Sequence, residues 1–102
     1  MSWTEYEMKV IRWSEDRKII PNSTPASQLE KAYEEMKELK DAIEANNEEG
    51  IIDGLGDVLV CLINVAALAN LDLTQCLASA YNEIKDRKGY LNTDGIFIKE
   101  VE

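Results

Sequence analysis

The sequence predicts an all-α protein, a bundle of four antiparallel helices followed by a short extended tail. Apolar residues recur at steps of three and four along the chain, which is the spacing of amphipathic helices. The four helical stretches are joined by short loops, and short loops place consecutive helices antiparallel to one another. We expect the 102 residues to form one domain, because they contain no repeat and no long linker.

The first two helices have clear start signals. Ser2-Trp3-Thr4-Glu5 has the form of a capping box, so we expect the first helix over residues 3–18. The stretch Ile19–Ser23 contains a proline and breaks this helix. Thr24 then serves as N-cap with Pro25 at the first helical position, and the second helix should reach residues 46–47.

The third helix should start at Glu48 or Glu49 and reach Asn70. Its second half is apolar nearly all round, which indicates burial on several sides. The sequence Asp72–Gln75 resembles a capping box and should begin the fourth helix, which Gly89 is suited to end. Residues 90–102 form the tail, with an extended segment expected at 95–98.

Composition excludes several classes of function. The chain has 20 acidic and 11 basic residues, a net charge of −9, so we expect no nucleic acid polymer as a partner. It has no histidine, which excludes nucleophiles activated by histidine and zinc sites built on histidine. Cys61 and Cys76 lack a metal or redox spacing, and we expect two buried free thiols in a reducing compartment. We find no membrane span or signal peptide, and therefore expect a cytoplasmic protein without a membrane partner.

Two acidic clusters lie on consecutive predicted helices. Glu34, Glu35 and Glu38 belong to the second helix, and Asp53 and Asp57 belong to the third. Glu35 shares a helix face with Glu38, and so does Asp53 with Asp57, because a helix advances about 100° per residue. Carboxylates that meet where a helix enters the core repel one another unless a cation neutralises them. Oxygen ligands suit Mg²⁺ or Mn²⁺. The alternative is that the glutamates form a solvated helix face.

Other residues allow two interpretations each. Lys85, Arg87 and Lys88, near the end of the fourth helix, either favour the helix dipole or neutralise phosphate oxygens opposite a metal. Asn64, which has aliphatic neighbours, either cross-links helices by hydrogen bonds or contacts a ligand. Trp13 either belongs to the core, which we favour, or faces a nucleobase.

Together these motifs resemble the MazG-type all-α nucleotide pyrophosphohydrolases. Glu34-Glu35-x-x-Glu38 is followed about twenty residues later by Gly56-Asp57-Val58-Leu59, which opens an apolar helix. Further segments that resemble the family are Arg12–Arg17, Asn22–Pro25, Gln28–Lys31, Asn82-x-x-Lys85 and Arg87-Lys88-Gly89. The resemblance covers about residues 10–100 and is closest to short phage or bacterial proteins.

The resemblance implies roles for particular residues. The metal ligands of the family match Glu35, Glu38 and Asp57 here. The family has another glutamate three positions before this aspartate, where the chain has Gly54. Asp53 lies on the same helix face as Asp57 and is the nearest acid that could take its place. The implied substrate-binding residues are Trp13, Asn22, Gln28, Lys31, Asn82, Lys85, Arg87 and Lys88.

The implied reaction is Mg²⁺-dependent hydrolysis of a (deoxy)nucleoside triphosphate to the monophosphate and pyrophosphate. Glu34 or Glu38 would position or deprotonate the attacking water, and Lys85 would stabilise charge on the phosphates. Family members commonly assemble, so we expect a homodimer or homotetramer, acting in the host cytoplasm if the protein is phage-encoded. The alternative, motivated by Gly54, is a catalytically silent helical oligomer that binds a nucleotide or a protein partner.

Overall fold

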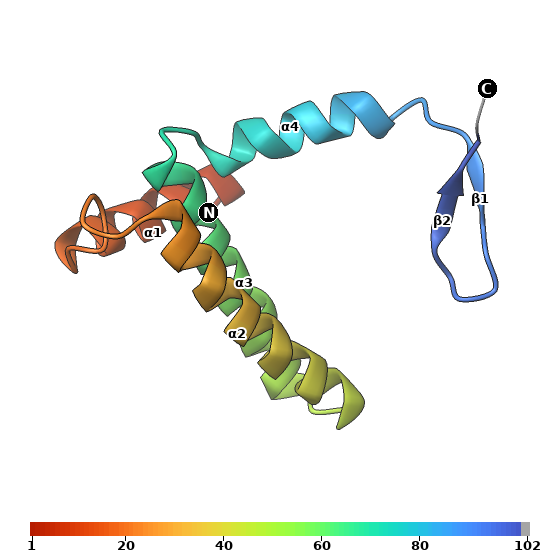
Figure 1. The fold of residues 1–102 in the computed structure, drawn as a ribbon, viewed down its shortest axis with the longest axis horizontal. Coiled ribbons are helices and arrows are strands. Elements are labelled where there is room, and N and C mark those ends of the chain that lie inside the picture. The colour runs from red at the N-terminus through yellow and green to blue at the C-terminus, as the bar shows by residue number, and fades with distance from the viewer. Residues whose placement is uncertain (101–102) are drawn as a thin grey trace.

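The computed structural model describes residues 1–100, which form four helices and one small β-hairpin (Figure 1). The helices are α1 (Trp3–Asp16), α2 (Pro25–Glu44), α3 (Glu48–Leu68) and α4 (Leu73–Ile84). The strands β1 (Gly89–Leu91) and β2 (Phe97–Lys99) pair antiparallel. The prediction of an all-α fold with four helices is confirmed.

Side-chain caps explain where the helices begin. Ser2, Thr24 and Asp72 each accept a hydrogen bond from the backbone N–H three residues further on, at 3.3, 3.1 and 2.7 Å. These are the three N-caps that the sequence predicts. Asn47 caps α3 in the same way and accepts from the N–H of Gly50 at 3.2 Å. Each helix start is therefore set by a few consecutive residues.

Three of the helices end about two residues before the predicted positions. The reason is a left-handed backbone at Lys18, Asn46 and Asn70, whose φ angles are 64°, 51° and 60°. A residue in this conformation cannot continue a right-handed helix. Asparagine tolerates the conformation better than most residues, which accounts for two of the three positions.

The prediction that Gly89 ends the fourth helix is wrong. Helix α4 ends at Ile84, and Gly89 begins β1 opposite Lys99. A Cβ atom on Gly89 would lie 2.2 Å from the carbonyl oxygen of Ile98 and 2.6 Å from the ring of Phe97. The hairpin therefore requires glycine here because the opposite strand approaches too closely for a side chain.

Within residues 1–100 the C-terminal tail forms a β-hairpin; the extended segment expected at 95–98 is observed at Phe97–Lys99, because Gly95 belongs to the turn, and residues 101–102 of the predicted tail lie outside the described residues. Its turn is held by Asn92, whose Oδ1 accepts hydrogen bonds from the N–H groups of Asp94 and Ile96 at 2.9 and 3.0 Å. Gly95 has a φ of 78° in this turn, a conformation that favours glycine.

The helices are arranged in an open shape. Helices α2 and α3 form a long antiparallel hairpin, and α1 lies across one end of it (Figure 1). Helix α4 starts at this end and points away from the hairpin, with the β-hairpin beyond its far end. The Cα radius of gyration is 16.1 Å, whereas a compact domain of about 100 residues has roughly 13 Å. In a single chain, α4 does not pack along the other helices.

Helix α1 holds the first turn of α4 through a buried carboxylate. Oε2 of Glu7 accepts a hydrogen bond from the backbone N–H of Leu73 at 2.7 Å, and its Oε1 accepts one from the hydroxyl of Thr74. The indole Nε1 of Trp3 also donates to this hydroxyl, at 2.8 Å. A carboxylate is favourable at a helix N-terminus, where backbone N–H groups lack partners.

The buried core is small and lies between α1, α2 and α3. In the second half of α3 the buried residues occur on several sides of the helix, as predicted. Helix α4 has no buried residue, so the prediction of two buried thiols holds for Cys61 only and Cys76 is exposed. The buried apolar residues are Ala32, Ala42, Cys61, Ile63 and Ala66.

Helix α3 is long and apolar enough, by length and composition alone, to cross a membrane. Its mean hydropathy reaches 2.0, and no other helix within residues 1–100 meets the same criteria. This helix is also the one against which α2, α1 and the start of α4 pack. The absence of a membrane partner stays a prediction.

Candidate functional site

The predicted metal ligands come from both helices of the α2–α3 hairpin. Glu35 and Glu38 are on α2, and Asp57 is on α3. The side chain of Glu35 is only 12% exposed, whereas that of its neighbour Glu34 is 69% exposed. A solvated helix face therefore describes Glu34 and the exposed Glu38 but does not describe Glu35.

One oxygen of Glu35 is buried without a hydrogen-bond partner within residues 1–100. Its Oε1 lies 3.3 Å from Nζ of Lys31, but its Oε2 has no donor in reach. A buried carboxylate oxygen is unfavourable unless a cation or a donor satisfies it. This oxygen is the clearest structural sign that a charged or hydrogen-bonding ligand belongs here.

The carboxylates of this region influence one another. The pKa of Glu38 is raised above its ordinary value of 4.5, first by the negative charge of Glu35, then by the hydrogen bond that a protonated Glu38 can donate to this carboxylate, and further by desolvation and by Asp57. The charge of Lys31 acts in the opposite direction. The pKa of the Cys61 thiol is also raised, mainly by burial and then by the charge of Glu35. Glu35, Glu38 and Asp57 therefore form one electrostatic cluster, which we call the acidic cluster.

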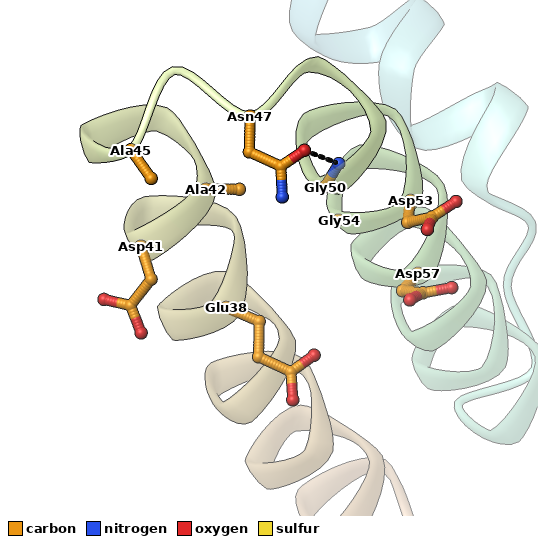
Figure 2. A pocket seen from close by; sticks show the side chains of 9 residues that line it. All are labelled: Glu38, Asp41, Ala42, Ala45, Asn47, Gly50, Asp53, Gly54 and Asp57. Carbon is orange, nitrogen blue, oxygen red and sulfur yellow. Dashed lines mark hydrogen bonds between the residues drawn. The ribbon is translucent and has the colours of Figure 1, made fainter.

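The side chains of the acidic cluster do not converge on one point. In the part of the chain that the structure describes, no three acidic or cysteine side chains are placed to hold a metal ion as they stand. Figure 2 shows Asp53 and Asp57 one turn apart on α3, with Glu38 across from them on α2. These three residues border a cavity of about 460 Å³ near the tip of the hairpin. Glu38 and Asp57 are exposed, so their side chains are free to rotate towards an ion.

Gly54, which stands where the family has its other glutamate, borders the same hairpin-tip cavity as Glu38 and Asp57 but has no side chain to offer it. It is buried against Leu39 of α2. Asp53, the residue expected to take the place of that glutamate, is exposed and borders the cavity at the hairpin tip.

A second cavity, of about 440 Å³, lies where α1, α2 and α3 meet, beside the acidic cluster. We call it the junction cavity. Trp13 borders it and is 46% exposed, so the assignment of Trp13 to the core is wrong. The guanidinium of Arg17 lies over the indole, 5.3 Å from the ring centroid, which restrains the orientation of the ring. The lining residues are Trp13, Ile19, Gln28, Lys31, Glu35, Asp57, Val60, Cys61 and Asn64.

A chain of hydrogen bonds connects the junction cavity with the core. Oγ of Ser14 donates to Oδ1 of Asn64 at 2.6 Å, and Nδ2 of Asn64 donates to Oε1 of Gln28 at 3.3 Å. Nε2 of Gln28 in turn donates to Oγ of Ser23 at 3.2 Å. Ser14 is 0% and Asn64 2% exposed. The prediction that Asn64 cross-links helices is confirmed, because these bonds join α3 to both α1 and α2.

Other residues predicted to bind the substrate lie away from the junction cavity. Nδ2 of Asn22 donates to the carbonyl oxygen of Lys18 at 2.9 Å, so Asn22 stabilises the loop between α1 and α2. Asn82 and the basic run Lys85–Lys88 lie at the far end of α4, remote from the α2–α3 hairpin (Figure 1). A single chain does not bring them to the acidic cluster.

Helix α1 contributes residues that the sequence analysis missed. Tyr6 and Lys9 line a smaller cavity of about 340 Å³, which also borders Trp13, Asp57 and Val60. Tyr6, Lys9 and Trp13 are separated by three and four positions. This helical spacing was the signal that could have grouped them on one face of α1.

Comparisons with known proteins bear on the identity of the chain. Residues 23–91 match the MazG nucleotide pyrophosphohydrolase domain. The chain is also 34% identical over 61 residues, 60% of its length, to an "Uncharacterized 18.2 kDa protein in rep-hol intergenic region" of Haemophilus phage HP1 (strain HP1c1). The aligned part covers 37% of that phage protein. No solved structure matches the chain. Because the match to the domain includes the acidic cluster and spans more than half of the chain, the protein belongs to the MazG nucleotide pyrophosphohydrolase family.

Proposed function

We propose that the protein hydrolyses (deoxy)nucleoside triphosphates to the monophosphate and pyrophosphate, with Mg²⁺ as cofactor. Membership of the MazG family supports a pyrophosphohydrolase. The observation that carries the proposal is the buried Oε2 of Glu35, which lacks a hydrogen-bond partner within residues 1–100. It belongs to the same cluster as Glu38 and Asp57, and carboxylate oxygens are the ligands that Mg²⁺ and Mn²⁺ prefer.

The four carboxylates would have different roles. Glu35, Glu38 and Asp57 would hold the cation, with Asp53 one helical turn away as a further ligand. When bound, the cation would neutralise negative charge on the phosphates and lower the pKa of a water molecule bound to it. We favour Glu38 over Glu34 as the residue that positions or deprotonates this water. Glu38 borders the hairpin-tip cavity beside Asp57, whereas the side chain of Glu34 is 69% exposed and turned to solvent.

The junction cavity would receive the nucleoside. Trp13 offers an exposed indole face on which a base can stack. Gln28 offers an amide that can hydrogen-bond to the edge of the base. Lys31 borders the same cavity beside Glu35 and would contact phosphate oxygens.

We also propose that the protein acts as a homodimer or homotetramer. Leu77, Tyr81 and Ile84 form an apolar stripe on α4 and are at least half exposed. Large apolar patches of this kind mark interaction surfaces. Charge favours a second copy as the partner, because the basic run Lys85–Lys88 at the end of α4 complements the acidic α2–α3 hairpin. The partner's acidic cluster would then receive Asn82, Lys85, Arg87 and Lys88 as substrate-binding residues.

Pyrophosphate release from a panel of ribonucleoside and deoxynucleoside triphosphates tests the proposed reaction. We expect release from at least one substrate, dependent on Mg²⁺ or Mn²⁺. Glu38→Gln and Asp57→Asn should abolish it. Glu44→Gln is the matched control, because Glu44 is an exposed glutamate on α2 that pairs with Lys40 away from the cluster. A folded protein that releases pyrophosphate from none of the triphosphates would refute the proposal.

The second candidate is a catalytically silent helical oligomer that binds a nucleotide or a protein partner. Two observations favour it: no three acidic side chains of the described residues are placed to hold an ion, and Gly54 replaces a family glutamate. Calorimetry separates the candidates. Triphosphate binding without pyrophosphate release in Mg²⁺ or Mn²⁺ would support the silent oligomer.

A further inference from the structure

The hydrogen-bond chain Ser14–Asn64–Gln28–Ser23, which we call the amide chain, has one end in the core and reaches the junction cavity through Gln28. Apolar side chains could hold α1, α2 and α3 together equally well, because a pair of buried polar groups adds little net stability over well-packed apolar ones. We propose that the amide chain fixes the orientation of the Gln28 amide, and that this orientation selects the nucleobase. The inference rests on the proposed function.

Ser14 is fully buried, and Oδ1 of Asn64 is the one hydrogen-bond partner of its hydroxyl within residues 1–100, so this hydroxyl has to donate and thereby sets the direction of the chain. The hydroxyl of Ser14 donates to Oδ1 of Asn64, which leaves Nδ2 of Asn64 facing Gln28. Gln28 therefore turns Oε1 towards Asn64 and Nε2 towards Ser23. Each of these two groups keeps one unused bonding position, a lone pair on Oε1 and an N–H on Nε2. The Gln28 amide thus has one acceptor and one donor left, in a fixed order.

Nucleobases fall into two classes by the order of their donors and acceptors. Cytosine and adenine have an amino donor next to a ring-nitrogen acceptor, whereas uracil, thymine and guanine have a carbonyl acceptor next to a ring N–H donor. For a base held in one position, an amide of fixed orientation can pair at both positions with one class only. The other class would leave polar groups unpaired, and such sites discriminate strongly. Ser14 and Asn64 are positioning residues in this scheme, because they act through Gln28.

Deoxycytidine and deoxyuridine triphosphates are the informative pair of substrates, because they have the same size and differ in this order. We expect wild-type kcat/KM to differ between them by at least about tenfold. Ser14→Ala removes the hydroxyl that orients Asn64 and should bring the ratio close to one, through KM, with kcat changed by less than about twofold. Ser27→Ala removes an exposed hydroxyl of α2 outside the amide chain and should keep the wild-type ratio.

A double variant separates orientation from stability. Ser14→Ala leaves Oδ1 of Asn64 buried without its donor and should lower the melting temperature. Ser14→Ala combined with Asn64→Leu removes both buried polar groups and should regain melting temperature without regaining discrimination. If discrimination returns together with stability, or if Ser14→Ala keeps the wild-type ratio, the amide chain has only a structural role and the inference is wrong.

Binding measurements keep this inference separate from the proposed hydrolysis. If the wild-type protein hydrolyses neither substrate, the reaction fails, but calorimetric binding of the same two triphosphates in Mg²⁺ still tests the amide chain. A binding preference that is lost in Ser14→Ala supports it. Equal affinity of the wild-type protein for both triphosphates overturns it.

Discussion

Gly54 of α3 lies directly against Leu39 of α2, at one of the close contacts between the two helices. A Cβ atom on Gly54 would lie 3.0 Å from the Cβ and 3.1 Å from the Cα of Leu39. A Cα atom belongs to the backbone and cannot move aside as the end of a side chain can. Where the family has a glutamate, this chain therefore has a helix contact, and a glutamate would force the helices apart.

Substitution of Gly54 and Gly56, two of the three glycines in α3, should have opposite effects on stability. Gly54→Ala should lower the free energy of unfolding by about 1–3 kcal/mol, because it overpacks the contact with Leu39. Gly56→Ala is the matched control: nothing lies within 4 Å of its would-be Cβ, so the change should stabilise α3 by about 0.5–1 kcal/mol. Urea unfolding measures both. Gly54→Ala as stable as the wild type would contradict the close contact.

Mg²⁺ should raise the melting temperature of the wild-type protein, because a ligand that binds only the folded state stabilises it. Glu35→Gln and Asp57→Asn should remove this response. Asp53→Asn should keep most of it, because Asp57 borders both the hairpin-tip cavity and the junction cavity, whereas Asp53 borders only the first. An equal loss in Asp53→Asn and Asp57→Asn would instead make Asp53 a full ligand.

The stability of the metal-free protein should fall as the pH rises just above 4.5. The pKa of Glu38 is raised in the folded state, mainly by Glu35, so folding favours the protonated carboxyl. Its contribution is fully present below the ordinary value of 4.5 and is lost as the pH rises through the raised value. Glu35→Gln removes the main cause and should flatten this dependence. Urea unfolding of the wild-type protein and of Glu35→Gln, measured in a chelator at several pH values above 4.5, gives the pH dependence of the free energy of unfolding for each protein.

The apolar stripe of α4 should control assembly. Leu77→Lys places a charge within the stripe and should reduce the oligomer to a smaller species, as measured by sedimentation, with loss of any activity. Ser79→Lys adds the same charge on the opposite side of α4 and should leave the assembly intact. If both variants keep the wild-type mass, the stripe is not the interface.

Mixing two inactive variants should restore activity if the site is shared between copies. Asp57→Asn lacks a metal ligand and Lys85→Met lacks a phosphate contact, so each alone should be inactive. Co-refolded dimers with random pairing should regain about a quarter of wild-type activity, because half of them are mixed and each mixed dimer has one intact site. No recovery in demonstrably mixed dimers would place Lys85 outside the partner's site.

The parts of the structure that the sequence predicts are those that depend on neighbouring residues. The N-caps Ser2, Thr24 and Asp72 each act on a group three residues away, so local sequence identifies them. The grouping of Glu35 with Glu38 follows in the same way from helical periodicity.

The parts that the sequence does not predict depend on residues far apart in the chain. Ser14 and Asn64 are separated by 50 positions, and no local pattern pairs them. Trp13 has the type and spacing of a core residue, yet it borders a cavity and is 46% exposed, because α1 crosses the end of the hairpin. Glycine is favoured both at helix ends and where two strands approach closely, so the residue type of Gly89 does not distinguish these roles. Only its pairing with Lys99 in the hairpin identifies the second role.

Because Glu7 of α1 holds the first turn of α4, a small rotation at this contact moves the far end of α4 by a larger distance. Helix α4 has 12 residues, so its far end lies about 18 Å from this contact. A rotation of about 10° at Glu7 would move the basic run Lys85–Lys88 by roughly 3 Å, the length of a hydrogen bond. The direction of α4, and with it the position of the basic run, therefore depends on Glu7 near the N-terminus. A substitution in α1 can displace the basic run without changing any residue of α4.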